Sequence, residues 1–261
     1  MPHSVTLKID QATKHLSNLK KEVNAFLSRK PFIVVTEEDS SGDLVYRIRI
    51  QASIPVRWSA DIGDLLHNLR SALDHLAWEL VLANGQQPTR DTSFPISDDE
   101  PSFKDNLQKQ LHGASAAART AVENLKPYKG GGSDDLWRIH TLNLIDKHRM
   151  IVLAGASYQK VPFQMTQPEK LGRPEVEAPP FTLRPADRQF PLKDGAEIFR
   201  LKAATKDSFR RYMQSDFLFG FMIAFGDTTI VDGEDILGTL QRFISVVQQV
   251  VSEVCTQVAL P

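Results

Sequence analysis

Seven side chains able to transfer protons, bind metals or form hydrogen bonds recur between residues 59 and 84. They comprise two histidines, two aspartates, an asparagine, a serine and a tryptophan, namely Asp64, His67, Asn68, Ser71, Asp74, His75 and Trp78. If this stretch is helical, each residue advances about 100°, and the seven positions fall within an arc of roughly 120°. A simply solvated helix face is normally rich in Lys, Glu and Gln. This composition therefore predicts a face with a chemical or structural role.

An arginine and a histidine of this stretch, Arg70 and His75, form an R-x4-H motif with the sequence Arg-Ser-Ala-Leu-Asp-His. The motif resembles the signature of HEPN-type ribonucleases, in which it lies on a helix of a small bundle that usually dimerises to build one site. The resemblance implies metal-independent RNA cleavage of the toxin or defence type, by a homodimer and without a cofactor. His75 would act as general acid or base, and Arg70 would hold the scissile phosphate. Asp74 completes the candidate catalytic set.

The same residues also permit a non-catalytic interpretation. Arg70 and Asp74 have the spacing of a helix ion pair that contributes about 0.2 to 0.5 kcal/mol, and His75 would then fill a buried contact. Buried polar groups need partners, because an unpaired one costs about 1 to 3 kcal/mol. The alternative is therefore a structural or ligand-binding protein with a buried polar network between two helices. Its expected members are His67, Asn68, Asp74, His75, Asn143, Asp146, Lys147, His148 and Arg149. Residues 146–149 also fit a solvated or paired charge run, because four consecutive side chains of a helix point in four directions.

A third hypothesis is a metal-dependent hydrolase with ligands from two helices. Imidazole and carboxylate groups together suit Zn, Mn or Fe, and helical bundles present such ligands from facing helices. The candidate ligands are His67, Asp74 or His75 on the first helix and His140, Asp146 or His148 on the second. His67 and His75 would lie about 12 Å apart along one helix axis, so they cannot share one ion.

Three segments of the chain, 67–76, 94–96 and 143–149, together resemble a group of uncharacterised bacterial proteins. This resemblance spans residues from about 60 to 150, which is more of the chain than the R-x4-H motif covers. It implies a bacterial-type protein but brings no activity, so no function follows from it.

The elements that must position these groups are mainly helical in the first part of the chain. Apolar residues at alternating spacings of three and four predict a long N-terminal helix that ends before Pro31. Val, Ile and Tyr on either side of a turn predict a hairpin at 32–50. Ser59 is expected to cap the helix at 59–84, and Asn84 with the following glycine should end it. The face opposite the polar one is apolar: Leu65, Leu66, Leu69, Ala72, Leu73, Leu76, Ala77 and Leu80.

Shorter helices are expected at 103–111 and 114–125, before three consecutive glycines that break the chain. The next helix, at 134–150, carries apolar residues around its whole circumference. This distribution predicts a central helix that is buried on most sides.

In the second part of the chain, the sequence pattern predicts short strands between prolines and then a closing helix. The best strand candidates are 181–183, 196–201 and 218–225. The last of these is hydrophobic on both faces and is expected to lie inside a sheet. An amphipathic helix at 234–258 should close the core. The pattern predicts one α+β domain, residues 1–261, with a helical core and a mainly antiparallel strand-rich segment.

Composition narrows the class of protein. A formal net charge of −1 supplies no field that would draw the chain to a membrane or to DNA, so stable DNA binding is not expected. The single cysteine, Cys255, excludes an intrachain disulfide and a multi-cysteine metal site, and it fits a reducing cytoplasm. The first 13 residues lack the apolar core of a signal peptide, and no apolar run reaches the roughly 20 residues of a membrane helix. A soluble cytoplasmic protein is therefore expected.

Overall fold

The computed structural model describes residues 2–160, 190–204, 218–226 and 229–260. The chain forms two compact units, each built from segments that are distant in the sequence. The helical unit comprises Met1–Glu22, Pro55–Val152 and Phe225–Pro261, and the strand unit comprises Val23–Ile54 and Leu153–Ala224. Helices and small sheets occur together, which confirms the predicted α+β class. That the chain folds as one domain stays a prediction.

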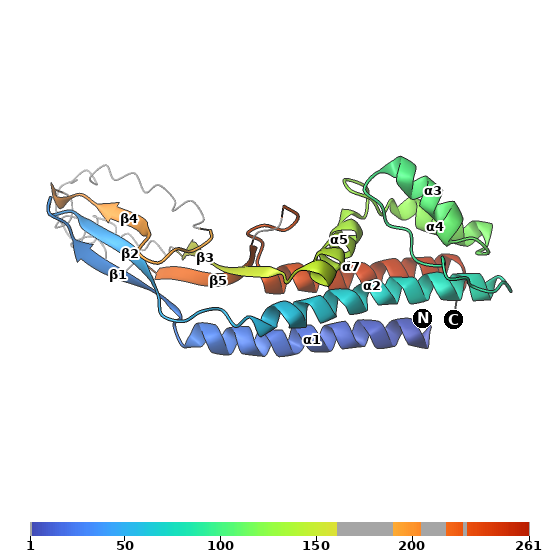
Figure 1. The fold of residues 1–261 in the computed structure, drawn as a ribbon, viewed down its shortest axis with the longest axis horizontal. Helices are drawn as coiled ribbons and strands as arrows, with labels where there is room; N and C mark the ends of the chain where they lie inside the picture. The colour runs from blue at the N-terminus through green and yellow to red at the C-terminus, as the bar shows by residue number, and fades with distance from the viewer. Residues whose placement is uncertain (1, 161–189, 205–217, 227–228, 261) are drawn as a thin grey trace, which may run out of the picture. The chain divides into compact units, whose positions relative to one another are not determined.

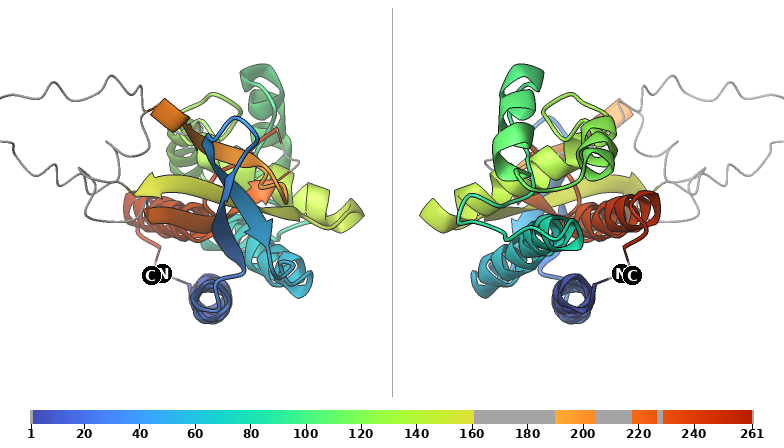
Figure 2. Two further views of the ribbon diagram at one scale, coloured as in Figure 1. Left: turned by 90° about the vertical axis from the view of Figure 1, so that its left-hand side faces the viewer. Right: turned by 90° about the vertical axis from the view of Figure 1, so that its right-hand side faces the viewer.

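The helices are α1 (His3–Ser28), α2 (Arg57–Ala83), α3 (Glu100–Gln110), α4 (Ala116–Leu125), α5 (Asp134–His148) and α7 (Ile236–Gln257). In the helical unit α1, α2 and α7 run alongside one another (Figures 1 and 2). α2 packs against both α5 and α7. α1 is tied to α2 at two places, since Ser4 Oγ donates to Glu79 Oε1 at 3.4 Å and Trp58 Nε1 donates to Glu22 Oε2 at 2.8 Å. α2 is therefore the central helix of this unit.

The two faces of α2 differ as the sequence predicts. The apolar positions opposite the polar face are at most 2% exposed: Leu65, Leu66, Leu69, Ala72, Leu73, Leu76, Ala77 and Leu80. The residues of the polar face are exposed or half-buried instead. One side of α2 thus lies in the core of the helical unit, and the polar side is at least partly accessible to solvent.

The start of α2 differs from its prediction, whereas its end agrees. Ser59 is not the N-cap, because the helix begins at Arg57 and Ser59 is buried within its first turn. Trp58 is 1% exposed and is held by a side chain of α1, so the first turn is packed before the serine is reached. Asn84 ends the helix as predicted, and Gly85 follows with a φ of 70°, which suits glycine.

α5 is buried on one face only, so the prediction of a helix buried on most sides is wrong. Its buried side chains are Leu136, Ile139, Leu142 and Asn143. Leu144, by contrast, is 40% exposed. One stripe of the helix packs toward α2 and α7, and Leu144 lies outside that stripe.

The remaining helices form where the sequence predicts them, although α3 begins at Glu100, three residues before its predicted start. α3, α4 and α7 each begin at a side chain that accepts a hydrogen bond from a backbone N–H of the first turn: Asp99, Ser115 and Asp235. The apolar side of α7 is buried and closes the core. In the part of the chain that the structure describes, no helix is both long and apolar enough to cross a membrane.

The strand unit contains two small sheets. β1 (Phe32–Glu38), β2 (Leu44–Ile50) and β4 (Glu197–Leu201) form an antiparallel sheet in the order β1-β2-β4, which includes the predicted hairpin. β3 (Val152–Lys160) and β5 (Leu218–Gly226) form the second sheet. The sequence does not single out β3, and among the described strands β5 pairs only with β3 rather than lying inside a sheet. The strand candidate at 181–183 lies outside the described residues.

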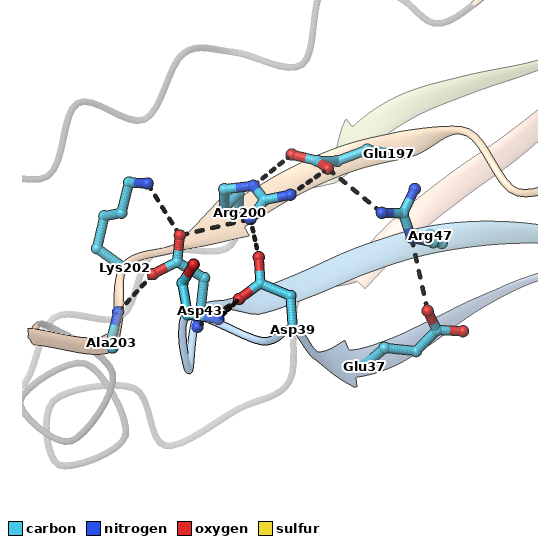
Figure 3. Close-up of polar contacts among 9 residues, drawn as sticks. Glu37, Asp39, Asp43, Arg47, Glu197, Arg200, Lys202 and Ala203 are labelled. Carbon is cyan, nitrogen blue, oxygen red and sulfur yellow. Dashed lines mark hydrogen bonds and ion pairs between the residues drawn. The ribbon is translucent and has the colours of Figure 1, made fainter.

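Ion pairs fasten β4 to the β1–β2 hairpin (Figure 3). Arg200 on β4 pairs with Asp39 in the hairpin turn. Asp43, which is buried, accepts hydrogen bonds from Lys202 Nζ at 2.9 Å and from the Ala203 N–H at 3.0 Å. The Lys202 contact and then the Ala203 N–H hold the pKa of the Asp43 carboxyl below its usual range. This cluster has a clear structural role in joining strands that are distant in the sequence.

Candidate functional site

Arg70 is held by hydrogen bonds at the border between the buried and the polar face of α2. Its Nη2 donates to Asp74 Oδ1 at 2.8 Å and to the Phe94 carbonyl at 2.8 Å. The Phe94 N–H donates to the same Asp74 oxygen at 3.0 Å. The Arg70 side chain is only 11% exposed. We call these three residues the Arg70 lock, because they fix the loop after α2 to the helix.

The Arg70 lock leaves one guanidinium nitrogen without a partner. Arg70 Nη1 is buried and makes no hydrogen bond among the described residues, and the same holds for Nδ1 of His140 on α5. Burial lowers the pKa of Arg70, an effect that Asp74 opposes. Burial, assisted by the charges of Arg70 and Lys147 and opposed by Asp98, lowers the pKa of His140 to about 4. His140 is therefore neutral at neutral pH, and the guanidinium is the buried charge in its surroundings.

A pocket of about 380 Å³ opens on the polar face of α2. Its lining combines α1, α2 and the loop after α2: Ser4, Asp74, His75, Trp78, Glu79 and Thr92. His75, Trp78 and Glu79 are neighbours on the helix surface because they are three and four positions apart. Trp78 is 46% exposed. The pocket thus presents an imidazole, an indole and carboxyl groups together.

The two motif residues occupy different places. His75 is half-buried and lines the pocket, whereas Arg70 lies outside the lining and is linked to it through Asp74, which belongs to both. Five positions along a helix correspond to a rotation of about 140°, which explains why the two side chains diverge. The predicted pairing of Arg70 with Asp74 is present, and the bond to the Phe94 carbonyl adds to it. The arrangement places an imidazole in the pocket, and the buried cation is linked to the pocket only through its ion pair with Asp74.

A second group of polar residues lies where α5 approaches α2. At Gly63 a Cβ would overlap the carboxyl group of Asp146, so glycine permits the close contact of the two helices. Burial raises the pKa of Asp146, the charge of Asp64 raises it further, and His67 opposes the rise. This group lies outside the pocket lining and shares none of its residues.

The predicted buried network is only partly assembled. Asn143 is 3% exposed, but Asn68 donates to a backbone carbonyl of its own helix at 2.8 Å. Lys147, His148 and Arg149 are exposed, which agrees with a solvated charge run and excludes these three residues from the buried network. Consecutive residues of a helix point in different directions, and a single packed stripe cannot bury all of them.

Among the residues that the structure describes, no three His, Cys, Asp or Glu side chains gather closely enough to hold a metal ion. The candidate ligands are spread over different surroundings. His75 lines the pocket, His140 is mostly buried on α5, and His67 Nε2 lies 3.5 Å from Ser71 Oγ. The described residues therefore do not form the two-helix metal site that the metal-hydrolase hypothesis expects.

The sequence does not single out several members of the site. Glu79 follows the motif histidine by one helical turn, so helix periodicity would have placed it at the pocket. Ser4 and Thr92 come from other elements, and their approach depends on tertiary packing. Phe94 acts through its backbone, which leaves no signal in the pattern of side chains.

Comparison of the chain with protein-family models, with curated protein sequences and with solved structures gives no match. The resemblance to HEPN-type ribonucleases therefore rests on the motif alone. The function has to be inferred from the chemistry of the pocket and the Arg70 lock.

Proposed function

We propose that this chain is a HEPN-like, metal-independent endoribonuclease of the toxin or defence type, which cleaves RNA in the pocket beside His75. One observation carries the proposal: His75 lines an open pocket, and the adjacent Asp74 joins that pocket to the buried Arg70. Histidine is the commonest side chain for proton transfer, and a fixed cation nearby favours a phosphate that gains negative charge. These features support acid–base cleavage of a phosphodiester.

In the proposed reaction a ribose 2′-hydroxyl attacks the adjacent phosphorus, and the bond to the 5′-oxygen breaks. The products are a 2′,3′-cyclic phosphate and a 5′-hydroxyl. His75 either takes the proton of the 2′-hydroxyl or gives one to the leaving oxygen. Because His75 is the histidine in the described pocket lining, the second proton transfer is assigned to His75 of a second copy. The proposal therefore includes a homodimer that brings two motifs together.

Arg70 has a different role from His75 in this proposal. Its bonds to Asp74 and Phe94 make it a positioning residue that fixes one wall of the pocket. Its charge lies in a medium of low dielectric, where electrostatic interactions are screened less than in water. Because it pairs with Asp74, it would offset the negative charge of that carboxyl group at the pocket and so lower the repulsion that a phosphate meets there.

A structural role is the second candidate, and the burial of the Arg70 lock favours it. Removing one partner of a buried charged pair leaves the other uncompensated and is strongly destabilising. Under this alternative the motif maintains the fold, and the pocket binds a ligand without cleaving it. The two candidates differ in the role of His75. In the first, its removal abolishes cleavage; in the second, the parent chain itself does not cleave RNA.

The test is incubation of the EDTA-treated 261-residue chain with mixed RNA, beside its His75→Ala and His112→Ala variants. His112 is exposed and lies outside the pocket lining, so its variant is a matched histidine control. We expect 2′,3′-cyclic phosphate ends from the parent and from His112→Ala only, with matched melting temperatures for all three. A parent that does not cleave, or a His75→Ala variant that cleaves equally fast, overturns the proposal. A parent that does not cleave, together with a collapsed melting temperature for His75→Ala, supports the structural role.

A further inference from the structure

Trp78 differs from the other two tryptophans of the chain. Trp58 is 1% exposed, and Trp137 is held by a hydrogen bond from Nε1 to Asp98 Oδ1 at 2.7 Å. Trp78 is 46% exposed and lines the pocket. An indole exposed at a pocket can stack on any nucleobase, because every base has a flat aromatic face. The pocket therefore has a platform for a planar ligand.

Glu79 supplies the polar side of the same pocket. Asp74 is the other carboxyl group of the lining, but its Oδ1 already accepts from both Arg70 and Phe94. Glu79 accepts from Ser4 Oγ over 3.4 Å, a long hydrogen bond, and a carboxylate has about four acceptor positions. Glu79 can therefore accept two more hydrogen bonds from a ligand that brings two donors.

We infer that the pocket is a guanine-binding subsite, in which Trp78 stacks on the base and Glu79 accepts hydrogen bonds from its N1–H and N2–H. Guanine is the RNA base with two adjacent donors on its Watson–Crick edge, and these match the two oxygens of a carboxylate. Adenine and cytosine offer one amino group beside an acceptor, and uracil offers one donor between two acceptors. The inference rests on the proposed function, and it names RNA with unpaired guanine as the substrate.

The position of His75 relative to this subsite sets where cleavage occurs. Glu79 follows His75 by four residues, so the two side chains are one helical turn apart, about 5 to 6 Å, on the same face of α2. A guanine held by Glu79 and Trp78 places its own ribose and phosphate close to the imidazole. Cleavage is therefore expected next to the bound guanine.

Binding can be measured without cleavage, because a mononucleotide has no internal phosphodiester. The parent chain, labelled with nitrogen-15, is titrated with GMP, AMP, CMP and UMP while the indole N–H signals are followed by NMR. The Trp78 signal, assigned by its loss in Trp78→Phe, should shift with GMP, whereas those of Trp58 and Trp137 should not. GMP should bind roughly tenfold or more tightly than AMP, as expected for a two-bond contact to one base.

Two glutamate variants test the hydrogen-bonding part of the inference. Glu79→Gln should remove the preference for GMP over AMP, because an amide offers one acceptor in place of two. Glu123→Gln should retain it, since Glu123 is exposed on α4 and lies outside the pocket lining. Equal affinity of the parent for all four nucleotides overturns the inference.

Cleavage of an RNA with one unpaired guanine separates this inference from the proposed function. Cleavage beside that guanine supports both. Cleavage without guanine preference, together with no GMP-dependent shift of Trp78, overturns the subsite and leaves the nuclease standing. A GMP-specific shift without any cleavage supports the subsite and overturns the nuclease. A shift of Trp78 with tetramethylammonium that equals the shift with GMP overturns guanine recognition, because it indicates a site for organic cations.

Discussion

Replacing Arg70 by alanine should destabilise the helical unit by an amount that follows from the Arg70 lock. The change removes two hydrogen bonds of Nη2, to Asp74 and to the Phe94 carbonyl, each 2.8 Å long. Loss of one partner of a buried charged pair costs about 3 to 5 kcal/mol. Because the Asp74 side chain is 37% exposed, water compensates part of this loss, and we expect about 3 kcal/mol in the free energy of unfolding. Asp74→Ala should cost about 3 kcal/mol or more, because it leaves the buried Arg70 guanidinium without its counter-charge and the Phe94 N–H without its acceptor.

A double-mutant cycle measured by urea unfolding isolates the contribution of the pair. Arg70→Ala and Asp74→Ala should show a coupling of about 1 kcal/mol or more, because each change removes the same hydrogen bond. Lys104 and Glu100 form a matched control at the same spacing, with side chains 57% and 52% exposed, and their coupling should be about 0.5 kcal/mol or less. Effects at Arg70 and Asp74 that simply add would refute the role assigned to the lock.

Three further predictions concern the helical unit. Gly63→Ala should lower the free energy of unfolding by about 1 kcal/mol, because the cost of displacing the Asp146 carboxyl exceeds the gain in helix propensity of alanine over glycine; an unchanged urea midpoint would contradict the close approach of α5. His140 has a pKa of about 4 in the folded chain and about 6.5 when unfolded. Between pH 6.5 and pH 4 the unfolded chain therefore binds more protons than the folded chain. Stability should therefore decrease over that range, by up to about 3 kcal/mol, and urea unfolding of His140→Gln at several pH values should show a flatter dependence. Cys255 is 5% exposed and burial raises the pKa of its thiol, so a thiol reagent should modify it only after unfolding; rapid modification of the folded chain would contradict this.

The faces of α2 could be predicted from the sequence because helix periodicity alone decides which residues share a side. The start of α2 could not be predicted in the same way. Ser59 has the side chain of an N-cap, but Trp58 packs in the core and bonds to Glu22, and this tertiary contact moves the start of the helix. The prediction that α5 is buried on most sides failed for a related reason. The sequence does not show which of its apolar residues will meet a neighbouring helix, and Leu144 does not.

Part of the candidate site was also accessible from the sequence. The pairing of Arg70 with Asp74 follows from their spacing, and the position of His75 and Trp78 on one face follows from the helix period. The depth of Arg70 could not be predicted, because it depends on a backbone carbonyl of the loop after α2. The pocket itself required the approach of α1, which the α2 sequence does not encode.

Whether His75 transfers a proton during RNA cleavage is decided most directly by single-turnover kinetics. The cleavage rate constant of a labelled, guanine-containing oligonucleotide is measured with EDTA-treated parent and with His75→Ala, after circular dichroism has shown equal folding. The proposed mechanism predicts that the variant is slower by roughly 100- to 10,000-fold, the contribution expected of a general acid or base. A His75→Ala variant that cleaves as fast as the parent, or a parent that leaves the oligonucleotide intact, would contradict it.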